Sequence, residues 1–211
     1  KADYSREMRQ TLENTENLTI KQAEIVDIIV EEGSITGVKT YTGGIYPCKA
    51  AVLATGTYLK ARCLCGETIT YTGPNGSDAL RREGIELVRF KTGTPARMDK
   101  RTIDFSKMVE QFGDKAVVPF SFTTDPASVQ KEQVSCWLTY TNEETHQIIR
   151  DNLDRSPIYA GIIEGTGPRY CPSIEDKIVK FADKNRHQVF LEPEGLHTNE
   201  MYVGAMSSSL P

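Results

Sequence analysis

Apolar residues in the first quarter of the chain change from a helical to a strand-like spacing. Tyr4, Met8 and Leu12 recur every four residues, which predicts one face of a helix that ends near residues 14–17. Beyond it, short apolar runs separated by Gly-containing turns predict strands at residues 18–22, 24–31, 35–41 and 45–54. The last run is apolar on both faces at residues 50–54. We therefore expect a β-meander that leads into a buried parallel strand.

The remaining patterns predict an alternation of helices, strands and polar loops. Helices are predicted at residues 77–83 and 104–112, the second with Gly113 as its C-cap. Thr141 and Glu144 have the spacing of a capping box at the start of another helix, and a last helix begins at Ser173 with Ile174, Ile178 and Phe181 on one face. Strands are predicted at residues 85–90, 117–122, 134–140, 188–191 and 201–205.

The composition is that of an ordinary globular α/β or α+β protein. The chain has 211 residues, 38% of them hydrophobic, and its 25 Lys and Arg against 29 Asp and Glu leave a net charge of −4. No apolar run approaches the roughly 18 residues of a membrane span, so we expect a soluble, cytoplasmic protein. A slightly acidic chain offers nucleic acid no bulk electrostatic attraction. Because the chain begins with Lys1 and not Met, we expect a piece of a longer protein.

The cysteines are five in number and scattered along the chain. A chain of this length needs no disulfide staples, so we expect some of the thiols to be free. Cys63 and Cys65 would share one strand face. A zinc site needs further ligands, and no second cysteine pair or nearby histidine provides them, so no metal is expected.

The segment 164–177 carries the most chemistry. Ser173 and Asp176 have capping-box spacing, which predicts a helix whose first N–H groups are directed toward the preceding turn. Such a helix end favours anions, phosphate above all. The helix end and Arg169 would also favour the thiolate form of Cys171, the best nucleophile candidate in the chain. A buried structural cysteine is an equal alternative.

Two other windows are candidates for binding nucleotide or phosphate. Thr55 and Gly56 form a small-residue turn after a predicted buried strand, where open α/β sheets hold nucleotides. Residues 91–97 carry Lys91 and Arg97 at their edges and could cradle a phosphate. A plain turn and a solvated polar loop are the respective alternatives.

The three histidines, His146, His187 and His197, are widely separated in sequence and have no evident Ser or Asp partner. A hydrolase triad therefore has no support. We expect Arg186 and His187 at the surface.

Several runs together form a distinctive set. They are GPRYCPSIEDK at 167–177, FLEPEG at 190–195, LATGTYL at 53–59, KTGTPAR at 91–97, RTIDFS at 101–106 and NLDRSP at 152–157. This set resembles the GidA/MnmG family of bacterial tRNA uridine 5-carboxymethylaminomethyl modification enzymes. The resemblance implies a flavoprotein of the glutathione-reductase type that uses FAD and NADH. With a partner GTPase, MnmE, such an enzyme adds a carboxymethylaminomethyl group at C5 of the wobble uridine of tRNA, using a folate-derived methylene. It also implies a homodimer.

The resemblance further implies roles for particular residues. Cys171 is the catalytic candidate, Ile25 lies at a largely backbone contact with the FAD adenine, and Thr55 with Gly56 faces the flavin. The nicotinamide nucleotide would bind at Gly167, Pro168, Arg169, Tyr170, Cys171, Pro172, Ser173, Ile174, Glu175, Asp176, Lys177, Ile178, Val179, Lys180 and Phe181.

The resemblance also implies an organisation for the chain. Residues 1–99 correspond to part of the FAD-binding domain with its meander, and residues 100–211 to an inserted NAD-binding or substrate region. The Gly-x-Gly-x-x-Gly fingerprint of the family is absent, so we expect the chain alone neither to hold FAD tightly nor to modify tRNA. Two rival functions are a folate- and FAD-dependent tRNA (uracil-5) methyltransferase and a non-catalytic module that binds nucleotide or tRNA.

Overall fold

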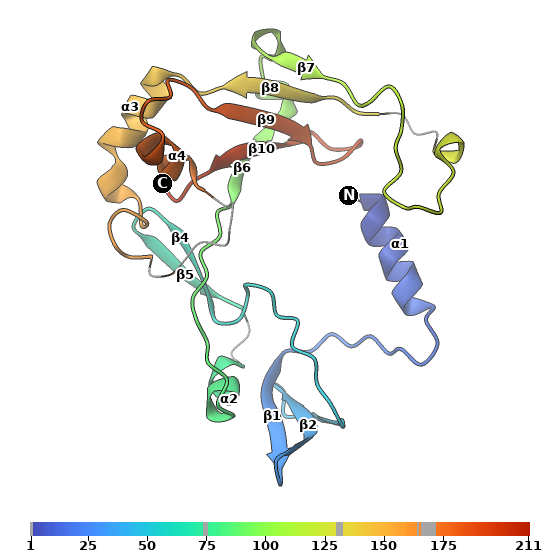
Figure 1. Cartoon of the computed structure of the whole chain (residues 1–211). Coiled ribbons are helices and arrows are strands. Elements are labelled where there is room, and N and C mark those ends of the chain that lie inside the picture. The colour runs from blue at the N-terminus through green and yellow to red at the C-terminus, as the bar shows by residue number, and fades with distance from the viewer. Residues whose placement is uncertain (1, 74–75, 130–132, 164, 166–171) are drawn as a thin grey trace. The chain divides into compact units, whose positions relative to one another are not determined.

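The computed structural model of the chain, which describes residues 2–73, 76–129, 133–163, 165 and 172–211, contains two compact units (Figure 1). The hairpin unit comprises Asp3–Thr92, Asp154–Tyr170 and Ser209–Pro211, and the five-stranded unit comprises Gly93–Leu153 and Cys171–Ser208 with Lys1–Ala2. Both contain helices and strands, so the fold is mixed α/β. In the described parts of the chain, no helix has the length and apolarity to cross a membrane. The functional boundary between residues 99 and 100 stays a prediction.

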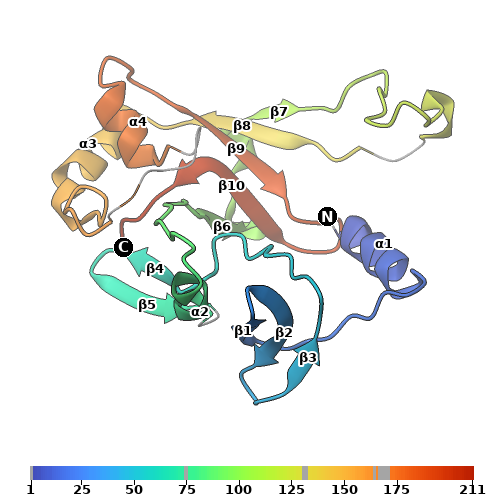
Figure 2. The same cartoon turned by 60° about the horizontal axis from the view of Figure 1, so that its bottom comes forward.

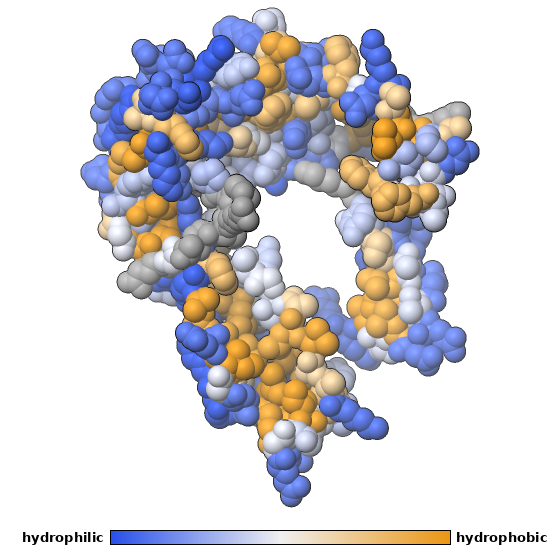
Figure 3. All heavy atoms as spheres, in the orientation of Figure 1, coloured by the Kyte–Doolittle hydropathy of each residue, from blue (hydrophilic) through white to orange (hydrophobic). Residues whose placement is uncertain are grey.

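The hairpin unit confirms the first helix and the meander. The helix is α1 (Ala2–Glu13), and the antiparallel sheet β1-β2-β3 is formed by β1 (Ile25–Glu31), β2 (Ser34–Thr40) and β3 (Ile45–Pro47). The predicted short helix is α2 (Ser77–Arg82), which packs on β1. Figure 3 shows hydrophobic side chains on the surface of α1, where Tyr4, Met8 and Leu12 are exposed.

A second hairpin in this unit was not predicted. β4 (Ala61–Cys65) pairs with β5 (Thr68–Thr72) across a two-residue loop, and Figure 2 shows the two strands side by side. Gly66 in that loop has a φ of 52°, the left-handed conformation that tight hairpin turns require. The loop carries Gly66-Glu67 in place of the Asn-Gly or Asp-Gly pair that predicts a two-residue hairpin, so the strongest sequence signal for this turn is absent.

Three predicted strands are wrong, because residues 18–22, 85–90 and 117–122 form no strand element. The predicted strand at residues 45–54 is confirmed only at β3, and its apolar part at residues 50–54 forms no strand. A strand exists only where a neighbouring strand accepts and donates its backbone hydrogen bonds. A buried parallel strand also needs cover on both faces, yet Val52 is 91% exposed. Apolar side chains alone therefore do not make these runs into strands.

The five-stranded unit holds an antiparallel sheet in the order β6-β10-β9-β8-β7 (Figure 2). The strands are β6 (Pro95–Asp99), β7 (Val109–Gln111), β8 (Cys136–Tyr140), β9 (Gln188–Pro193) and β10 (Glu200–Ser207). Alternate residues of β9 and β10 form the core of the sheet: Val189, Leu191, Met201 and Val203. The last three predicted strands are thus confirmed.

The predicted helix at residues 104–112 is wrong. Asp104 caps a 3₁₀ turn at Phe105–Lys107, and the chain then forms β7 beside β8. Phe105 packs against Trp137 with ring centroids 4.7 Å apart, and Met108 also packs on the core. The short apolar pattern of residues 104–112 is compatible with a helix or a strand, and packing against the sheet selects the turn and strand that are observed.

Helices α3 (Glu143–Asp151) and α4 (Ile174–Lys180) contact each other at one end of this sheet (Figures 1 and 2). The cap of α3 is Asn142 and not Thr141, since the Asn142 side chain accepts from the Thr145 N–H at 2.8 Å. The capping box of α4 is confirmed.

Candidate functional site

Ile25 and Thr55, two residues singled out in the sequence, line the same hollow of the hairpin unit. This hollow has a volume of about 180 Å³ and lies between β1 and α2. Leu53, Ala79 and Leu80 contribute to its mostly apolar walls. Residues remote in sequence are thus brought together here, and we call this space the apolar hollow.

A glycine brings α2 close to β1 at this place. A Cβ on Gly76 would lie 3.1 Å from the carbonyl oxygen of Ile25, tighter than an ordinary contact. A side chain at this position would push the start of α2 away from the strand and alter the apolar hollow.

A second, polar hollow of about 270 Å³ adjoins the first, because Thr55 and Leu59 line both. Gly56 lies on its wall with a φ of 54°, so the turn predicted after residue 54 is present although the strand before it is not. Thr55 and Gly56 are exposed and accessible to a ligand.

Gly165, two residues ahead of the GPRYCPSIEDK run, lies against the wall of the polar hollow. A Cβ on Gly165 would meet the carbonyl oxygen of Arg89 at 2.7 Å, and its φ is 136°. Only glycine fits this position. Residues 167–171, including Cys171 and Arg169, lie outside the described residues.

The rest of the run is described, and α4 holds it to the sheet. Asp176 accepts from the Ser173 N–H at 3.3 Å, and the Ser173 hydroxyl accepts from the Asp176 N–H at 3.2 Å. Glu175 is 0% exposed and accepts a hydrogen bond from the Ser208 hydroxyl. Lys177 donates to the Ala205 carbonyl at 2.9 Å, and burial lowers the pKa of its ammonium group.

Residues 91–97, a candidate phosphate cradle or polar loop, are not a loop throughout, because residues 95–97 belong to strand β6. Arg97 pairs with Glu194 at 3.1 Å and Glu200 at 3.3 Å, and its guanidinium stacks over Tyr202. The charge of Arg97 is therefore engaged within the sheet.

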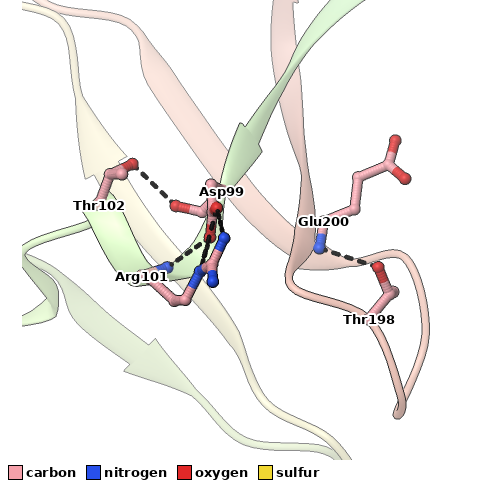
Figure 4. Close-up of polar contacts among 5 residues, drawn as sticks. All are labelled: Asp99, Arg101, Thr102, Thr198 and Glu200. Carbon is pink, nitrogen blue, oxygen red and sulfur yellow. Dashed lines mark hydrogen bonds and ion pairs between the residues drawn. The ribbon is translucent and has the colours of Figure 1, made fainter.

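The end of β6 carries a separate ion pair. Arg101 folds back onto Asp99 and donates to both carboxylate oxygens, at 3.0 and 3.1 Å from Nε (Figure 4). These hydrogen bonds lower the pKa of Asp99 to about 2. The pair stabilises the turn that follows β6.

His146 and His187, which lie far apart in sequence, are neighbours in the five-stranded unit. The rings of His146 and His187 stack, and Nε2 of His146 lies 2.8 Å from the Thr141 hydroxyl. His187 is half-buried, so its predicted surface position is wrong, and Arg186 stacks over Tyr140. The helical spacing of His146 with Ile149 was the only signal of its burial.

The described cysteines, Cys48, Cys63, Cys65 and Cys136, are free thiols, as expected. Cys63 and Cys65 lie exposed on β4. The described residues contain no cluster of three His, Cys, Asp or Glu side chains that could hold a metal ion.

Comparisons with known proteins agree over the whole chain. Residues 1–211 match the family of glucose inhibited division protein A. Two relatives, both described as tRNA uridine 5-carboxymethylaminomethyl modification enzyme MnmG, match 100% of this chain: that of Lachnoclostridium phytofermentans at 66% identity and that of Heliobacterium modesticaldum at 56%. The chain covers 35% and 34% of their respective lengths.

A solved structure shares the fold. GidA of Aquifex aeolicus superposes with a TM-score of 0.88 at 51% identity, over 99% of this chain and 37% of that chain. Matched along its full length in sequence and in fold, the chain belongs to the glucose inhibited division protein A family, GidA/MnmG, and spans about a third of its curated relatives.

Proposed function

We propose that the chain is part of an enzyme that adds a carboxymethylaminomethyl group at C5 of the wobble uridine of tRNA, using FAD and NADH. The observation that carries the proposal is the 66% identity, over the entire chain, to a relative described as a tRNA uridine 5-carboxymethylaminomethyl modification enzyme. Because the chain spans 35% of that relative, the activity belongs to the complete polypeptide. The same holds for the tRNA substrate, the partner GTPase MnmE, the homodimer and a cytoplasmic location.

The apolar hollow fits the adenine end of FAD. Its apolar walls can bury the faces of a flat ring, and the β1 backbone at Ile25 offers polar groups to the ring edge. The close approach of Gly76 to Ile25 sets its width. When bound, FAD supplies the redox chemistry of the reaction, and Thr55 with Gly56 would face it from the turn between the two hollows.

A domain of the glutathione-reductase type also explains the exposed run at residues 50–54. A run that is apolar on both faces is typical of a parallel strand with neighbours on both sides, and we propose that it is such a strand in the complete polypeptide. We propose that residues 1–99 contribute to that domain and that the flanking strands come from the remainder of the complete polypeptide. Residues 100–211 would then be the inserted region for NAD and substrate.

The nicotinamide nucleotide is proposed to bind along residues 167–181. The contacts of α4 support this, because Glu175 and Lys177 tie the helix to the sheet unit at Ser208 and Ala205. These two contacts fix α4, the described part of the proposed site, against the end of β10. A folate-derived methylene would be the one-carbon co-substrate.

Cys171 is the proposed nucleophile. Its thiolate would form an S–C6 bond with the uracil ring, while the C5–C6 π electrons move toward O4 and make C5 nucleophilic. After C5 has gained its substituent, loss of the C5 proton and departure of the thiolate restore the ring. Cys171→Ser in the complete polypeptide should abolish modification and leave tRNA binding unchanged. A normal rate in this variant would rule out the role.

The product identifies the function. The purified complete polypeptide should be yellow and should oxidise NADH, and mass spectrometry of nucleosides from tRNA treated together with MnmE should show the carboxymethylaminomethyl group. A 5-methyluridine product would instead establish the folate-dependent methyltransferase. A colourless protein that binds without turnover would establish the non-catalytic module.

A further inference from the structure

The polar hollow of the hairpin unit is lined by three cationic side chains from different parts of the chain. Lys60 follows the Thr55-Gly56 turn, Arg81 belongs to α2, and Arg89 lies in the segment between α2 and residue 92. Glu86 is the one carboxylate among the described residues that line it. Its volume of about 270 Å³ is near the lower limit of pockets that hold small ligands.

Arg89 is held in place by the loop that carries Lys60. Its NH1 group donates to the Lys60 carbonyl oxygen at 2.7 Å. That bond uses one of the five N–H groups of a guanidinium, whose planar fork matches the oxygens of a phosphate. This hydrogen bond therefore holds the segment that carries Arg89 next to the loop that carries Lys60, so both cationic side chains line the same hollow.

Asp78 offsets part of this charge only weakly. It pairs with Lys60 at 3.4 Å and with Arg81 at 3.5 Å, but its side chain is largely exposed. Exposed ion pairs of this kind contribute little to stability, so an anion in the hollow can compete for both cations.

Ser77 supplies an independent indication of a ligand. The residue is 2% exposed, lines the polar hollow, and its hydroxyl has no hydrogen-bond partner among the described residues. A buried hydroxyl without a partner destabilises the fold, and rotation about a single side-chain bond would let it donate to an oxygen in the hollow.

We propose that the polar hollow binds a phosphate group through its three cations and the Ser77 hydroxyl. A phosphate brings several acceptor oxygens and a negative charge, which match these donors better than a neutral ligand does. The phosphate is carried by a nucleotide cofactor or by the RNA backbone. Only this choice of source rests on the proposed function.

The test is calorimetric titration of the complete, cofactor-free polypeptide with inorganic pyrophosphate at low ionic strength. Arg81→Gln and Arg89→Gln should each weaken binding about tenfold, the effect of one charge-assisted hydrogen bond. Ser77→Ala should weaken it as well. Arg89→Lys should restore part of the loss, because it returns the charge without the fork.

Arg82 provides a matched control on the same helix. It pairs with Asp27 at 2.5 Å and does not line the hollow, so Arg82→Gln should leave pyrophosphate binding unchanged. Thermal unfolding of each variant verifies that it is folded. The proposal is overturned if the wild type does not bind pyrophosphate, or if Arg82→Gln weakens binding as much as Arg81→Gln.

Competition identifies the source of the phosphate. Loading with FAD should block pyrophosphate if the cofactor provides it, and an anticodon stem-loop RNA should displace pyrophosphate if the RNA backbone does. If neither FAD nor the RNA displaces pyrophosphate, the hollow has no part in the reaction and its assignment is overturned. Failure of the proposed function would be seen separately, in the modified nucleoside, with pyrophosphate binding intact.

Discussion

The imidazole rings of His146 and His187 stack with centroids 5.3 Å apart and an interplanar angle of 30°. The Thr141 hydroxyl contacts both residues, since it accepts from the backbone N–H of His187 at 2.8 Å and lies 2.8 Å from the ring Nε2 of His146. Nδ1 of His146 and Nε2 of His187 are buried and have no hydrogen-bond partner among the described residues. The pair connects the end of β8, the first turns of α3 and the residue before β9.

The first prediction is that acid destabilises the five-stranded unit through this pair. Burial is the main cause that lowers the pKa of both histidines. Arg150 lowers the pKa of His146 further, and Glu143 partly opposes it. His146 and Lys177 lower the pKa of His187 further, and Asp183 partly opposes them. A folded-state pKa below the unfolded value of about 6.5 means that the unfolded chain binds more protons, so the stabilisation is complete above about pH 6.5 and declines below it.

Urea unfolding of the complete polypeptide at pH values on either side of about 6.5 measures this effect. His146→Gln should flatten the pH dependence, whereas His197→Gln, at an exposed histidine, should leave it as in the wild type. Equal slopes in wild type and His146→Gln would contradict the prediction.

The second prediction concerns the cap of α4. Ser173→Ala should lower the free energy of unfolding by about 1 kcal/mol, because it removes the acceptor for the Asp176 N–H. Ser173→Thr keeps the acceptor and should lose much less. Chemical denaturation compares the three proteins, and an unchanged midpoint for the alanine variant would show that the cap does not stabilise the helix.

The third prediction concerns the width of the apolar hollow. Gly76→Ala would place a methyl group 3.1 Å from the Ile25 carbonyl oxygen, so the start of α2 and β1 must move slightly apart to accommodate it, which changes the hollow between them. The complete polypeptide should then retain less flavin after dialysis, as its visible absorbance reports. Gly195→Ala, whose Cβ would make an ordinary 3.6 Å contact with Thr198, is the control. If Gly76→Ala retains as much flavin as the wild type, the apolar hollow is not part of the FAD site.

The fourth prediction concerns the ion pair at the end of β6. The hydrogen bonds from Arg101 lower the pKa of Asp99 to about 2, so Arg101→Gln should raise it toward the model-peptide value of about 3.9. A lowered acid pKa stabilises the fold above the unfolded value, and that contribution disappears as the pH falls from about 4 to 2. NMR titration of the Asp99 carboxyl in both proteins measures the difference; identical curves would show that the pair is not formed in solution.

Elements with short-range signals were predictable. The cap at Ser173 depends on Asp176 three residues later, and the strands of the meander pair with their neighbours across short turns. The family itself was recognisable from runs such as GPRYCPSIEDK. The charge of Arg97 was misread, because its partners Glu194, just after β9, and Glu200, at the start of β10, lie about a hundred residues further along the chain.

The sequence by itself determined the positions of α1 to α4, the positions of most strands along the chain and the residues that carry the family resemblance, since these depend on side chains close together along the chain. Tertiary structure alone decided that residues 104–112 turn into β7 and that Ile25 meets Thr55 at one hollow. The physical reason is that a strand, a buried histidine pair or a binding hollow is completed by partners far along the chain, and local periodicity carries no record of which partners those are.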